Sequence, residues 1–343
     1  MIIQILFHHS IFTTMKFTEH DEKVMEKFAS MIISRMEQMK AGDWKKGWIG
    51  SDITGGPVSI SARPYAGVNV LMLLMDTTMR GYKYPIYCTL KQANLLGGHV
   101  NKGSVSMPVI FWKFNITDPS GRKLSLEEYN RLSLSQRSAC TVIPILKSYN
   151  VFNIQQTNLG EVCPQKIDEL AKTFEGATLS DTRGMYKNAA IDKMLKGQTW
   201  LCPITYTKES TGAMYSPSKD RIIVPRKGQF KVHTAPEDVY VDGQEFYTTL
   251  LHEMIHSTGI VSRLNRNTGH RFGDKLYAKE ELVAELGAAR CGQALGFDAR
   301  ILDNNAAYLD GWIQSLQEEP KFVLTLLGDV DKASRMILDK LSA

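Results

Sequence analysis

The sequence His252-Glu253-Met254-Ile255-His256 constrains the fold of this chain more than any other feature. It lies in an apolar segment predicted to be a helix from Asp242 or Gly243 to Thr258, with Gly259 as its stop signal. Four residues make about one helical turn, so both imidazoles leave the same face and can bind one zinc ion. Glu253 lies beside the ligands, where its carboxylate can accept a proton from a water molecule that the ion acidifies. The alternative is a pair of core histidines without a metal.

A third ligand is expected from the helix predicted over residues 279–295, which offers Glu280, Glu281 and Glu285. Glu281 shares a helix face with small side chains that let another helix approach closely, whereas Glu280 points about 100° away. Glu281 is therefore the preferred ligand. Glu285, one turn further on, is predicted to accept a hydrogen bond from a ligating histidine. Alternatively, Glu285 is itself the ligand or a solvated charge.

The composition is that of a globular protein with about two domains. The chain has 343 residues, of which 43% are hydrophobic and 22% charged, which excludes disorder and a disulfide-stapled miniprotein. Residues 1–150 hold 18 Lys and Arg against 11 Asp and Glu, whereas residues 151–343 hold 23 against 25, within totals of 41 and 36. The basic part indicates a polyanionic partner, although ordinary surface variation would give the same count. We predict domains at 18–150 and 151–343, with 1–17 an uncertain N-terminal extension in which Met15 could be the true start.

Cysteine usage and hydropathy indicate a cytoplasmic protein without a membrane partner. The five cysteines are scattered and form no C-x-x-C pair, so a thiolate metal site is not expected. Free thiols fit a reducing compartment. No apolar run approaches the roughly 20 residues that span a bilayer.

The periodicity of apolar residues predicts an α+β architecture in both parts. In the first, helices are expected over 18–40, 65–80 and 90–96, and strands over 86–88, 105–114 and 141–146, with the polar residues 115–138 as an excursion from a hairpin. In the second, helices are expected over 167–174, 186–195, 304–316 and 321–341, and a hairpin over 213–216 and 221–224.

The metal motif followed 25 residues later by Glu281-Leu282-Val283-Ala284-Glu285 resembles the gluzincin arrangement of zinc peptidases. More closely, residues 247–259 and 277–289 resemble the ArdC antirestriction family, as do Tyr215-Ser216-Pro217, Asp220-Arg221-Ile222 and Ala306-Ala307-Tyr308-Leu309 with Trp312. The resemblance covers nearly the whole chain from about Asp21. It implies a zincin-like, gluzincin-type second domain with one zinc ion, or another divalent metal, and a first domain that binds single-stranded DNA.

Two segments of the basic part carry the same resemblance. Residues 63–69 match the family's R-x-Y-x-G-x-N segment, and residues 89–103 match its T-x-K-Q-A segment followed by glycine-rich turns. Single strands are held by cations along the phosphates and by aromatic rings that stack on bases, which predicts sequence-tolerant and salt-dependent binding. The alternative is that the aromatics belong to the core, as expected for Tyr87 and Trp112, and that the lysines are a solvated face. The predicted DNA contacts are Trp44, Lys45, Lys46, Trp48, Arg63, Tyr65, Asn69, Lys91, Gln92 and Lys102.

The leading hypothesis is a single-stranded DNA-binding antirestriction protein with a zinc-dependent peptidase domain, which protects incoming mobile-element DNA and acts on an unidentified protein substrate. One alternative is a DNA-binding protein whose metal site is structural or vestigial and performs no proteolysis. Another is a housekeeping protease whose basic part binds a protein partner.

Overall fold

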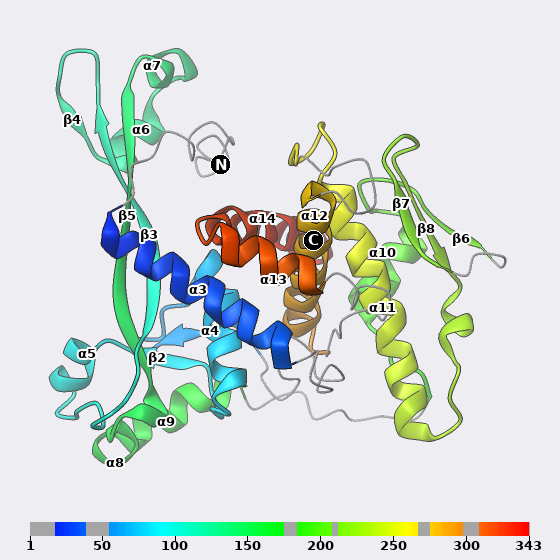
Figure 1. The fold of residues 1–343 in the computed structure, drawn as a ribbon, viewed down its shortest axis with the longest axis horizontal. Helices are drawn as coiled ribbons and strands as arrows, with labels where there is room; N and C mark the ends of the chain where they lie inside the picture. The colour runs from blue at the N-terminus through cyan, green and yellow to red at the C-terminus, as the bar shows by residue number, and fades with distance from the viewer. Residues whose placement is uncertain are drawn as a thin grey trace.

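The computed structural model describes residues 18–38, 55–174, 184–207, 212–266, 275–297 and 309–342. A five-stranded sheet lies on one side of the molecule, and a long helix with a three-stranded sheet lies on the other (Figure 1). Helices α12 (Lys275–Ala294), α13 (Leu309–Glu318) and α14 (Phe322–Ser342) fill the space between these two sides. The structure therefore confirms the predicted α+β class. The predicted extension at residues 1–17 lies outside the described residues.

The five-stranded sheet is built on one long antiparallel ribbon. Its strands are β1 (Val58–Ser59), β2 (Ile86–Cys88), β3 (Met107–Thr117), β4 (Lys123–Leu124) and β5 (Thr141–Asn153), in the order β1-β2-β5-β3-β4. β3 and β5 pair without interruption from Met107↔Val151 to Thr117↔Thr141. The predicted strands of this hairpin are confirmed but extend further, because the backbone ladder continues past the apolar residues that define the sequence pattern. β4, α6 (Leu126–Arg131) and α7 (Leu134–Ser138) form the predicted excursion.

Helices α3 (Glu19–Gln38) and α4 (Val68–Met79) pack against this sheet, and both were predicted within a few residues. Thr18 caps α3, with Asp21 as its partner: the Thr18 amide donates to Asp21 Oδ2 over 2.9 Å, and the Asp21 amide donates to Thr18 Oγ1 over 3.2 Å. The remaining short helices of this side and of the connection are α5 (Leu90–Leu95), α8 (Leu159–Val162), α9 (Pro164–Ala171) and α10 (Ala189–Gly197). Single turns of 3-10 helix occupy Ile154–Gln156, Lys172–Phe174 and Lys227–Phe230.

The other side contains α11 (Pro236–Thr258) and a sheet of β6 (Ile204–Thr207), β8 (Arg221–Pro225) and β7 (Met214–Ser216), in that order. β7 and β8 form the predicted hairpin. The predicted start of α11 at Asp242 or Gly243 is wrong, because the helix begins at Pro236. Asp242 instead accepts hydrogen bonds from the Val232 and His233 amides. Gly243 marks a close approach, since a Cβ there would lie 2.1 Å from the Tyr186 backbone nitrogen.

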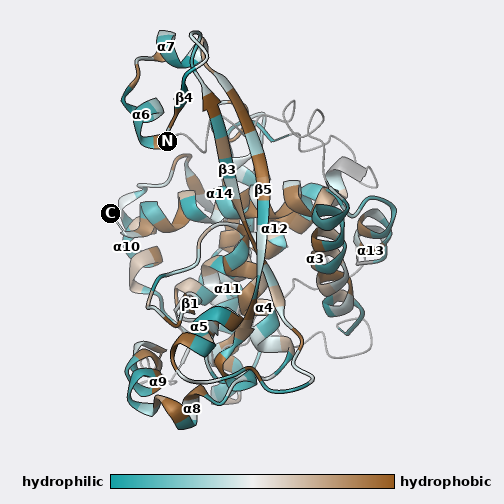
Figure 2. Cartoon of the chain, turned by 90° about the vertical axis from the view of Figure 1, so that its left-hand side faces the viewer, coloured by the Kyte–Doolittle hydropathy of each residue, from teal (hydrophilic) through white to brown (hydrophobic). Residues whose placement is uncertain are grey.

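One hydrophobic core connects the two sides. It includes Phe28 of α3, Leu74 of α4, Trp312 of α13 and Leu327 of α14, all fully or almost fully buried. Figure 2 shows that α3 carries both apolar and polar residues, as expected of a helix with one buried side. β5 runs through residue 150 to Asn153, so the proposed boundary at residue 150 falls within a strand. No helix among the described residues is long and apolar enough to cross a membrane.

Candidate metal centre and nucleic-acid interface

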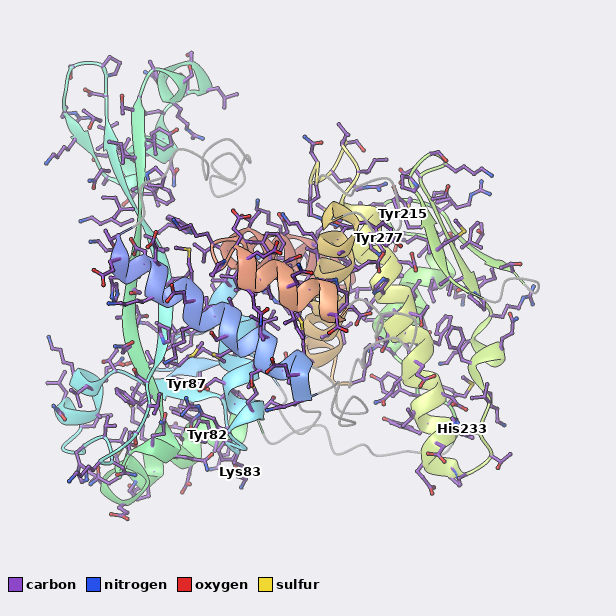
Figure 3. All side chains as sticks on the ribbon, viewed as in Figure 1. Tyr82, Lys83, Tyr87, Tyr215, His233 and Tyr277 are labelled. Atoms are coloured by element: carbon purple, nitrogen blue, oxygen red, sulfur yellow. The ribbon has the colours of Figure 1, made fainter. Side chains whose placement is uncertain are left out.

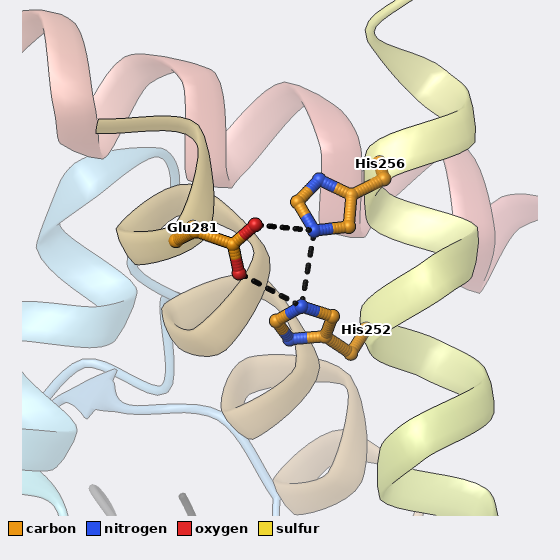
Figure 4. A group of neighbouring side chains, drawn as sticks. All are labelled: His252, His256 and Glu281. Carbon is orange, nitrogen blue, oxygen red and sulfur yellow. Dashed lines mark hydrogen bonds and ion pairs between the residues drawn. The ribbon is translucent and has the colours of Figure 1, made fainter. Parts of the chain in front are cut away.

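Helix α11 holds the metal motif in its buried second half. The Leu250, Leu251, Met254 and Ile255 side chains are fully buried, so this segment is fixed on several faces, and His252 and Glu253 are themselves buried. The helix ends with Gly259 as its C-cap, as predicted. The helical spacing places both imidazoles on the face toward α12 (Figure 4).

Helix α12 crosses α11 closely at a glycine. A Cβ on Gly287 would lie 2.7 Å from Ile255 Cδ1, which is nearer than real side chains approach. Ala284 and Ala288 are also buried in this region. Ala284 and Ala288 belong to the predicted face of small residues, whereas Gly287, which makes the closest approach, lies outside that face. This crossing brings the acidic first half of α12 to the two histidines of α11.

The side chains of three residues converge at the crossing of the two helices. His252 Nε2 and His256 Nε2 lie 3.0 Å apart, and the Glu281 oxygens lie 3.4 Å from His252 Nε2 and 3.5 Å from His256 Nε2 (Figure 4). Metal–ligand bonds of about 2.1 Å place neighbouring ligand atoms about 3.4 Å apart in a tetrahedron and about 3.0 Å apart in an octahedron. The triangle thus has the size of one coordination face, and its nitrogen and carboxylate donors suit a divalent transition metal.

The protonation chemistry of the cluster is consistent with a cation at its centre. Burial lowers the pKa of both histidines, but carboxylates offset this: Glu281 and Glu285 raise the pKa of His252 to about 9, and Glu280 and Glu281 raise that of His256 to about 10. The buried carboxylates thus favour positive charge at this point, and a bound divalent cation would take the place of the histidine protons. A divalent cation there satisfies both nitrogens and the Glu281 carboxylate together.

The far nitrogen of each imidazole faces another glutamate. His256 Nδ1 lies 3.2 Å from Glu280 Oε1, and His252 Nδ1 lies 3.5 Å from Glu285 Oε1. Glu285 thus lies behind His252, where the sequence predicts it, but the two atoms are not in hydrogen-bond geometry, so the predicted hydrogen bond is not formed in the structure. Glu280 leaves α12 in a different direction from Glu281, and this direction leads it to His256. Glu280 lies off the one face of this helix that the sequence predicts to carry ligands, so its position behind His256 is not predicted from helical spacing.

A buried arginine holds Glu280 in place. Arg266 donates to Glu280 Oε2 over 2.9 Å from Nε and to Glu280 Oε1 over 2.7 Å from Nη2. It also donates to Thr258 Oγ1 and to the Ile255 carbonyl at the end of α11. Burial raises the pKa of Glu280, but the Arg266 guanidinium more than offsets this and lowers it to about 2. Arg266 comes from a loop and has no periodic signal in the sequence.

Glu253 faces the three-stranded sheet. Its Oε2 accepts a 2.6 Å hydrogen bond from the Tyr215 backbone amide on the edge strand β7. The Tyr215 hydroxyl donates to Asp220 Oδ1 over 2.8 Å, and Arg263 donates to both oxygens of Asp220. Figure 3 shows Tyr215 on the strand side of α11. The Tyr215 and Asp220 segments, which resemble the ArdC family, therefore belong to a hairpin that is held against Glu253.

The predicted DNA contacts differ in where they lie and in how exposed they are. Trp44, Lys45, Lys46 and Trp48 lie outside the described residues. The Arg63, Lys91 and Lys102 side chains are exposed on the surface.

Gln92 and Asn69 already have partners in the fold. Gln92 forms a capping box with Thr89, and its Nε2 lies 3.4 Å from Ser61 Oγ, which brings the turn before Arg63 next to the start of α5. The Asn69 amide donates to the Ile110 carbonyl over 2.7 Å and accepts from the Ile110 amide over 2.9 Å, so it occupies the place of a neighbouring strand. Both the nitrogen and the oxygen of the Asn69 side chain are therefore already hydrogen-bonded within the fold.

Tyr87, Trp112 and Tyr65 take positions that agree with the alternative interpretation, in which aromatic residues of the basic part belong to the core. Tyr87 is fully buried, and its hydroxyl donates to Asp76 Oδ2 over 2.9 Å, which confirms its place in the core (Figure 3). Trp112 and Tyr65 are half-buried and pack against the main core. Burial raises the pKa of Tyr65, and the proximity of Tyr149 raises it further.

Comparisons with known proteins agree with this geometry. Residues 22–152 match the family model of the N-terminal domain of anti-restriction factor ArdC, and residues 199–326 match that of a zincin-like metallopeptidase. The chain is 30% identical to the DNA primase TraC of Escherichia coli, over 92% of this chain but 27% of the primase. It therefore spans about a quarter of the length of that relative. An uncharacterized Sinorhizobium fredii protein, y4eC, is 27% identical over 91% of both chains.

The fold is also that of a solved antirestriction protein. The metal-free crystal structure of ArdC from the R388 plasmid is 25% identical and matches with a TM-score of 0.62, covering 93% of this chain and 97% of that one. Its Mn(II)-bound structure matches with a TM-score of 0.61 at 26% identity, covering 93% and 98%. Fold and site together define an α+β protein with a zincin-like metallopeptidase domain. With an ArdC N-terminal domain before it, the chain belongs to the ArdC-like antirestriction family.

Proposed function

We propose that this chain is a single-stranded DNA-binding antirestriction protein whose second domain is a zinc-dependent peptidase. The observation that carries the peptidase proposal is the convergence of His252, His256 and Glu281 into one triangle of ligand size beside the buried Glu253. These three residues would hold the metal, with Glu280 and Glu285 behind the histidines. A bound divalent ion would polarise a peptide carbonyl and acidify water.

The residues around the site would then perform proton transfer. Glu253 would accept a proton from the attacking water while the water oxygen forms a bond to the peptide carbonyl carbon. The same carboxylic acid would give this proton to the leaving nitrogen as the C–N bond breaks. The Tyr215 amide, which donates to one oxygen of Glu253, would keep the carboxylate oriented and leave its other oxygen for the proton.

The metal is proposed to be zinc, with manganese as the alternative. A ligand set of two imidazoles and one carboxylate is common in catalytic zinc sites. The ligand-atom distances suit either a tetrahedral or an octahedral ion, and the R388 ArdC protein has been solved with Mn(II). Dialysis of purified protein followed by elemental analysis separates the two.

The DNA proposal rests on the N-terminal domain. Its family model is that of an antirestriction factor, and the net positive charge of the chain lies in this half, where 18 Lys and Arg stand against 11 Asp and Glu. Binding to incoming single strands would protect them from restriction. We place this activity in the cytoplasm, where restriction acts on entering DNA; the described cysteines are all free, as expected of a reducing compartment.

The test compares the wild type with Glu253→Gln. We expect both proteins to carry one equivalent of metal, and only the wild type to cleave casein or itself. We also expect the wild type to protect DNA from restriction. If the wild type is fully metallated but hydrolyses no protein, and Glu253→Gln protects DNA equally well, the metal site is structural or vestigial.

Binding to single strands is tested separately, with a fluorescent oligonucleotide at two salt concentrations. We expect binding that weakens steeply with salt. If no binding is found at low salt, the basic half has another partner, and the DNA part of the proposal is wrong.

A further inference from the structure

The outer face of the β3–β5 ribbon carries exposed aromatic rings and lysines that the sequence motifs did not indicate. Antiparallel residues that lie directly opposite each other point to the same side of a sheet. The register pairs Phe111 with Lys147 and Lys113 with Ile145, and it places Tyr149 opposite Val109. Phe111, Lys113, Lys147 and Tyr149 therefore share one face, and all four are exposed.

The opposite face of the same ribbon is covered. Its residues Trp112, Leu146 and Ile116 pack against hydrophobic clusters, and α3 lies against this side. The ribbon thus has one face in the core and one face in solvent along its upper part. Figure 2 views the molecule from the left-hand side of Figure 1, and in it β3 and β5 pass in front of α12 and α14.

The two aromatic rings form a platform on the outer face. The Phe111 and Tyr149 ring centroids lie 5.9 Å apart, on adjacent strands. Phe111 is 48% exposed and Tyr149 43% exposed, although large aromatic side chains bury most of their surface when they serve only the fold. An exposed pair held on a rigid hairpin offers two ring faces or edges to a planar ligand.

Positive charge continues along the same face, without any carboxylate on the two strands. Lys123 of β4 pairs with Thr117, so it also lies on the outer side at the far end of the ribbon. Neither β3 nor β5 contains Asp or Glu. From Phe111 to Thr117 the strand advances about 20 Å at about 3.4 Å per residue. Lys147, Lys113 and Lys123 are therefore spread over the length of a few nucleotides.

The Phe111 end of this outer face is connected to residues 63–69, the segment that the sequence motifs predict to contact DNA. Tyr65 lies two residues from the exposed Arg63, and its pKa is raised first by burial and then by Tyr149. Asn69 fixes Ile110, the residue before Phe111, through both of its backbone groups. The predicted contact segment 63–69 therefore leads to the aromatic pair and helps to position it.

We propose that the outer face of the β3–β5 ribbon, defined by Phe111, Tyr149, Lys113, Lys147 and Lys123, is a binding surface for single-stranded DNA. Bases would stack on the Phe111–Tyr149 pair, and the phosphates would follow the lysines toward β4. This inference rests on the proposed DNA-binding function and names the surface that performs it. Charge favours a polyanion here over a second copy of the chain, since such a copy would bring the same lysines face to face.

The first test uses the full chain and a fluorescein-labelled oligothymidylate. We expect Phe111→Ala and Tyr149→Ala each to weaken binding about 10-fold, since removing a stacking ring typically costs about 5- to 150-fold. Tyr149→Phe keeps the ring and should bind like the wild type. Leu134→Ala, which removes another highly exposed apolar side chain on α7, is the matched control and should have no effect. Thermal unfolding of each variant verifies that it is folded.

The second test separates charge from stacking through the salt dependence. We expect the pair Lys113→Gln and Lys147→Gln to reduce the slope of log affinity against log salt by about 1.4, because each phosphate contact contributes about 0.7 on single strands. The control pair Lys166→Gln and Lys196→Gln, on α9 and α10, removes the same charge from exposed helices elsewhere. The aromatic variants should leave the slope unchanged.

The outcomes distinguish this inference from the function on which it rests. If the wild type fails to bind at low salt, the proposed DNA function is wrong. If the wild type binds but the ribbon variants bind like their controls, DNA binds elsewhere and the inference is overturned. If Phe111→Ala instead alters the sedimentation of DNA-free protein and leaves DNA affinity unchanged, the face is a protein interface, and the inference is equally overturned.

Discussion

At the scale of single residues, the proposed metal site consists of three candidate ligands with further glutamates behind the two histidines. Each imidazole meets Glu281 on one side and a second glutamate on the other. Carboxylates that contact the far nitrogen of a ligating histidine fix its tautomer and ring orientation. Glu280 has an extra constraint, because the buried Arg266 holds both of its oxygens.

We expect loss of the Glu280–Arg266 pair to weaken metal binding about 10- to 100-fold, which is typical of partners behind a ligand. Glu280→Gln alone would leave the Arg266 charge buried and destabilise the fold. The double variant Glu280→Gln with Arg266→Met removes both charges at similar volume and is therefore the cleaner test. Titration calorimetry with Zn²⁺ and with Mn²⁺ measures the change, and Glu169→Gln on the exposed face of α9 is the control. Unchanged affinity in the folded double variant would show that the pair serves only the fold.

Sequence reasoning found the parts of the site that depend on local geometry. His252 and His256 follow from helical spacing, and Glu281 follows from the face it shares with small residues. Arg266 and Tyr215 could not be found in this way, because a loop and an edge strand bring them to the site from elsewhere in the chain. Their positions depend on tertiary packing, which periodicity does not encode.

At the scale of elements, replacing each of two glycines in helix interiors by alanine is expected to change the free energy of unfolding in opposite directions. Gly243→Ala in α11 would place a Cβ 2.1 Å from the Tyr186 backbone nitrogen, whereas Gly328→Ala in α14 meets nothing within 4 Å. Both changes improve helix propensity by about 1 kcal/mol. We expect Gly328→Ala to raise the free energy of unfolding by up to that amount, and Gly243→Ala to lower it by about 3 kcal/mol. Denaturant titration of both variants checks the signs; equal effects would refute the close approach.

The stability contributed by the contact between His233 and Asp242, near the start of α11, is expected to depend on pH. His233 Nδ1 lies 2.7 Å from Asp242 Oδ1, and this hydrogen bond raises the pKa of His233. Burial raises the pKa of Asp242, but its hydrogen bonds from His233 and Val232 lower it overall. A raised histidine pKa stabilises the fold fully below about 6.5 and loses its effect as the pH rises through the folded value.

We therefore expect His233→Gln to lower the melting temperature more at pH 5.5 than at pH 8.5. The Asp242 contribution is present at both values, since its lowered pKa lies below this window. Lys231→Gln, an exposed neighbour of similar position, serves as the control. Melting curves at the two pH values measure the difference, and a deficit that does not depend on pH would exclude the ion pair.

At the scale of the whole molecule, the two family-matched parts are one packed body. α3 packs against α13, and α4 packs against α14, so helices from the two ends of the sequence share a core. The change in charge near residue 150 predicts a division of the chain; one family model ends at residue 152 and the other begins at residue 199. The shared core could not be predicted, because the apolar faces of helices do not specify which distant helix covers them.

This shared core predicts that both parts unfold together. Phe28 of α3 and Trp312 of α13 are almost fully buried in it, and the Trp312 indole donates to the Ala278 carbonyl on α12 over 2.6 Å. Truncation of such a side chain to alanine costs about 3 to 5 kcal/mol. We expect the wild type to show a single calorimetric transition, and both Phe28→Ala and Trp312→Ala to shift that same transition downward. Leu134→Ala on the exposed α7 should leave it unchanged. Two transitions, of which Phe28→Ala moves only one, would instead mean that the part proposed to bind DNA and the part proposed to hold the metal are independently stable.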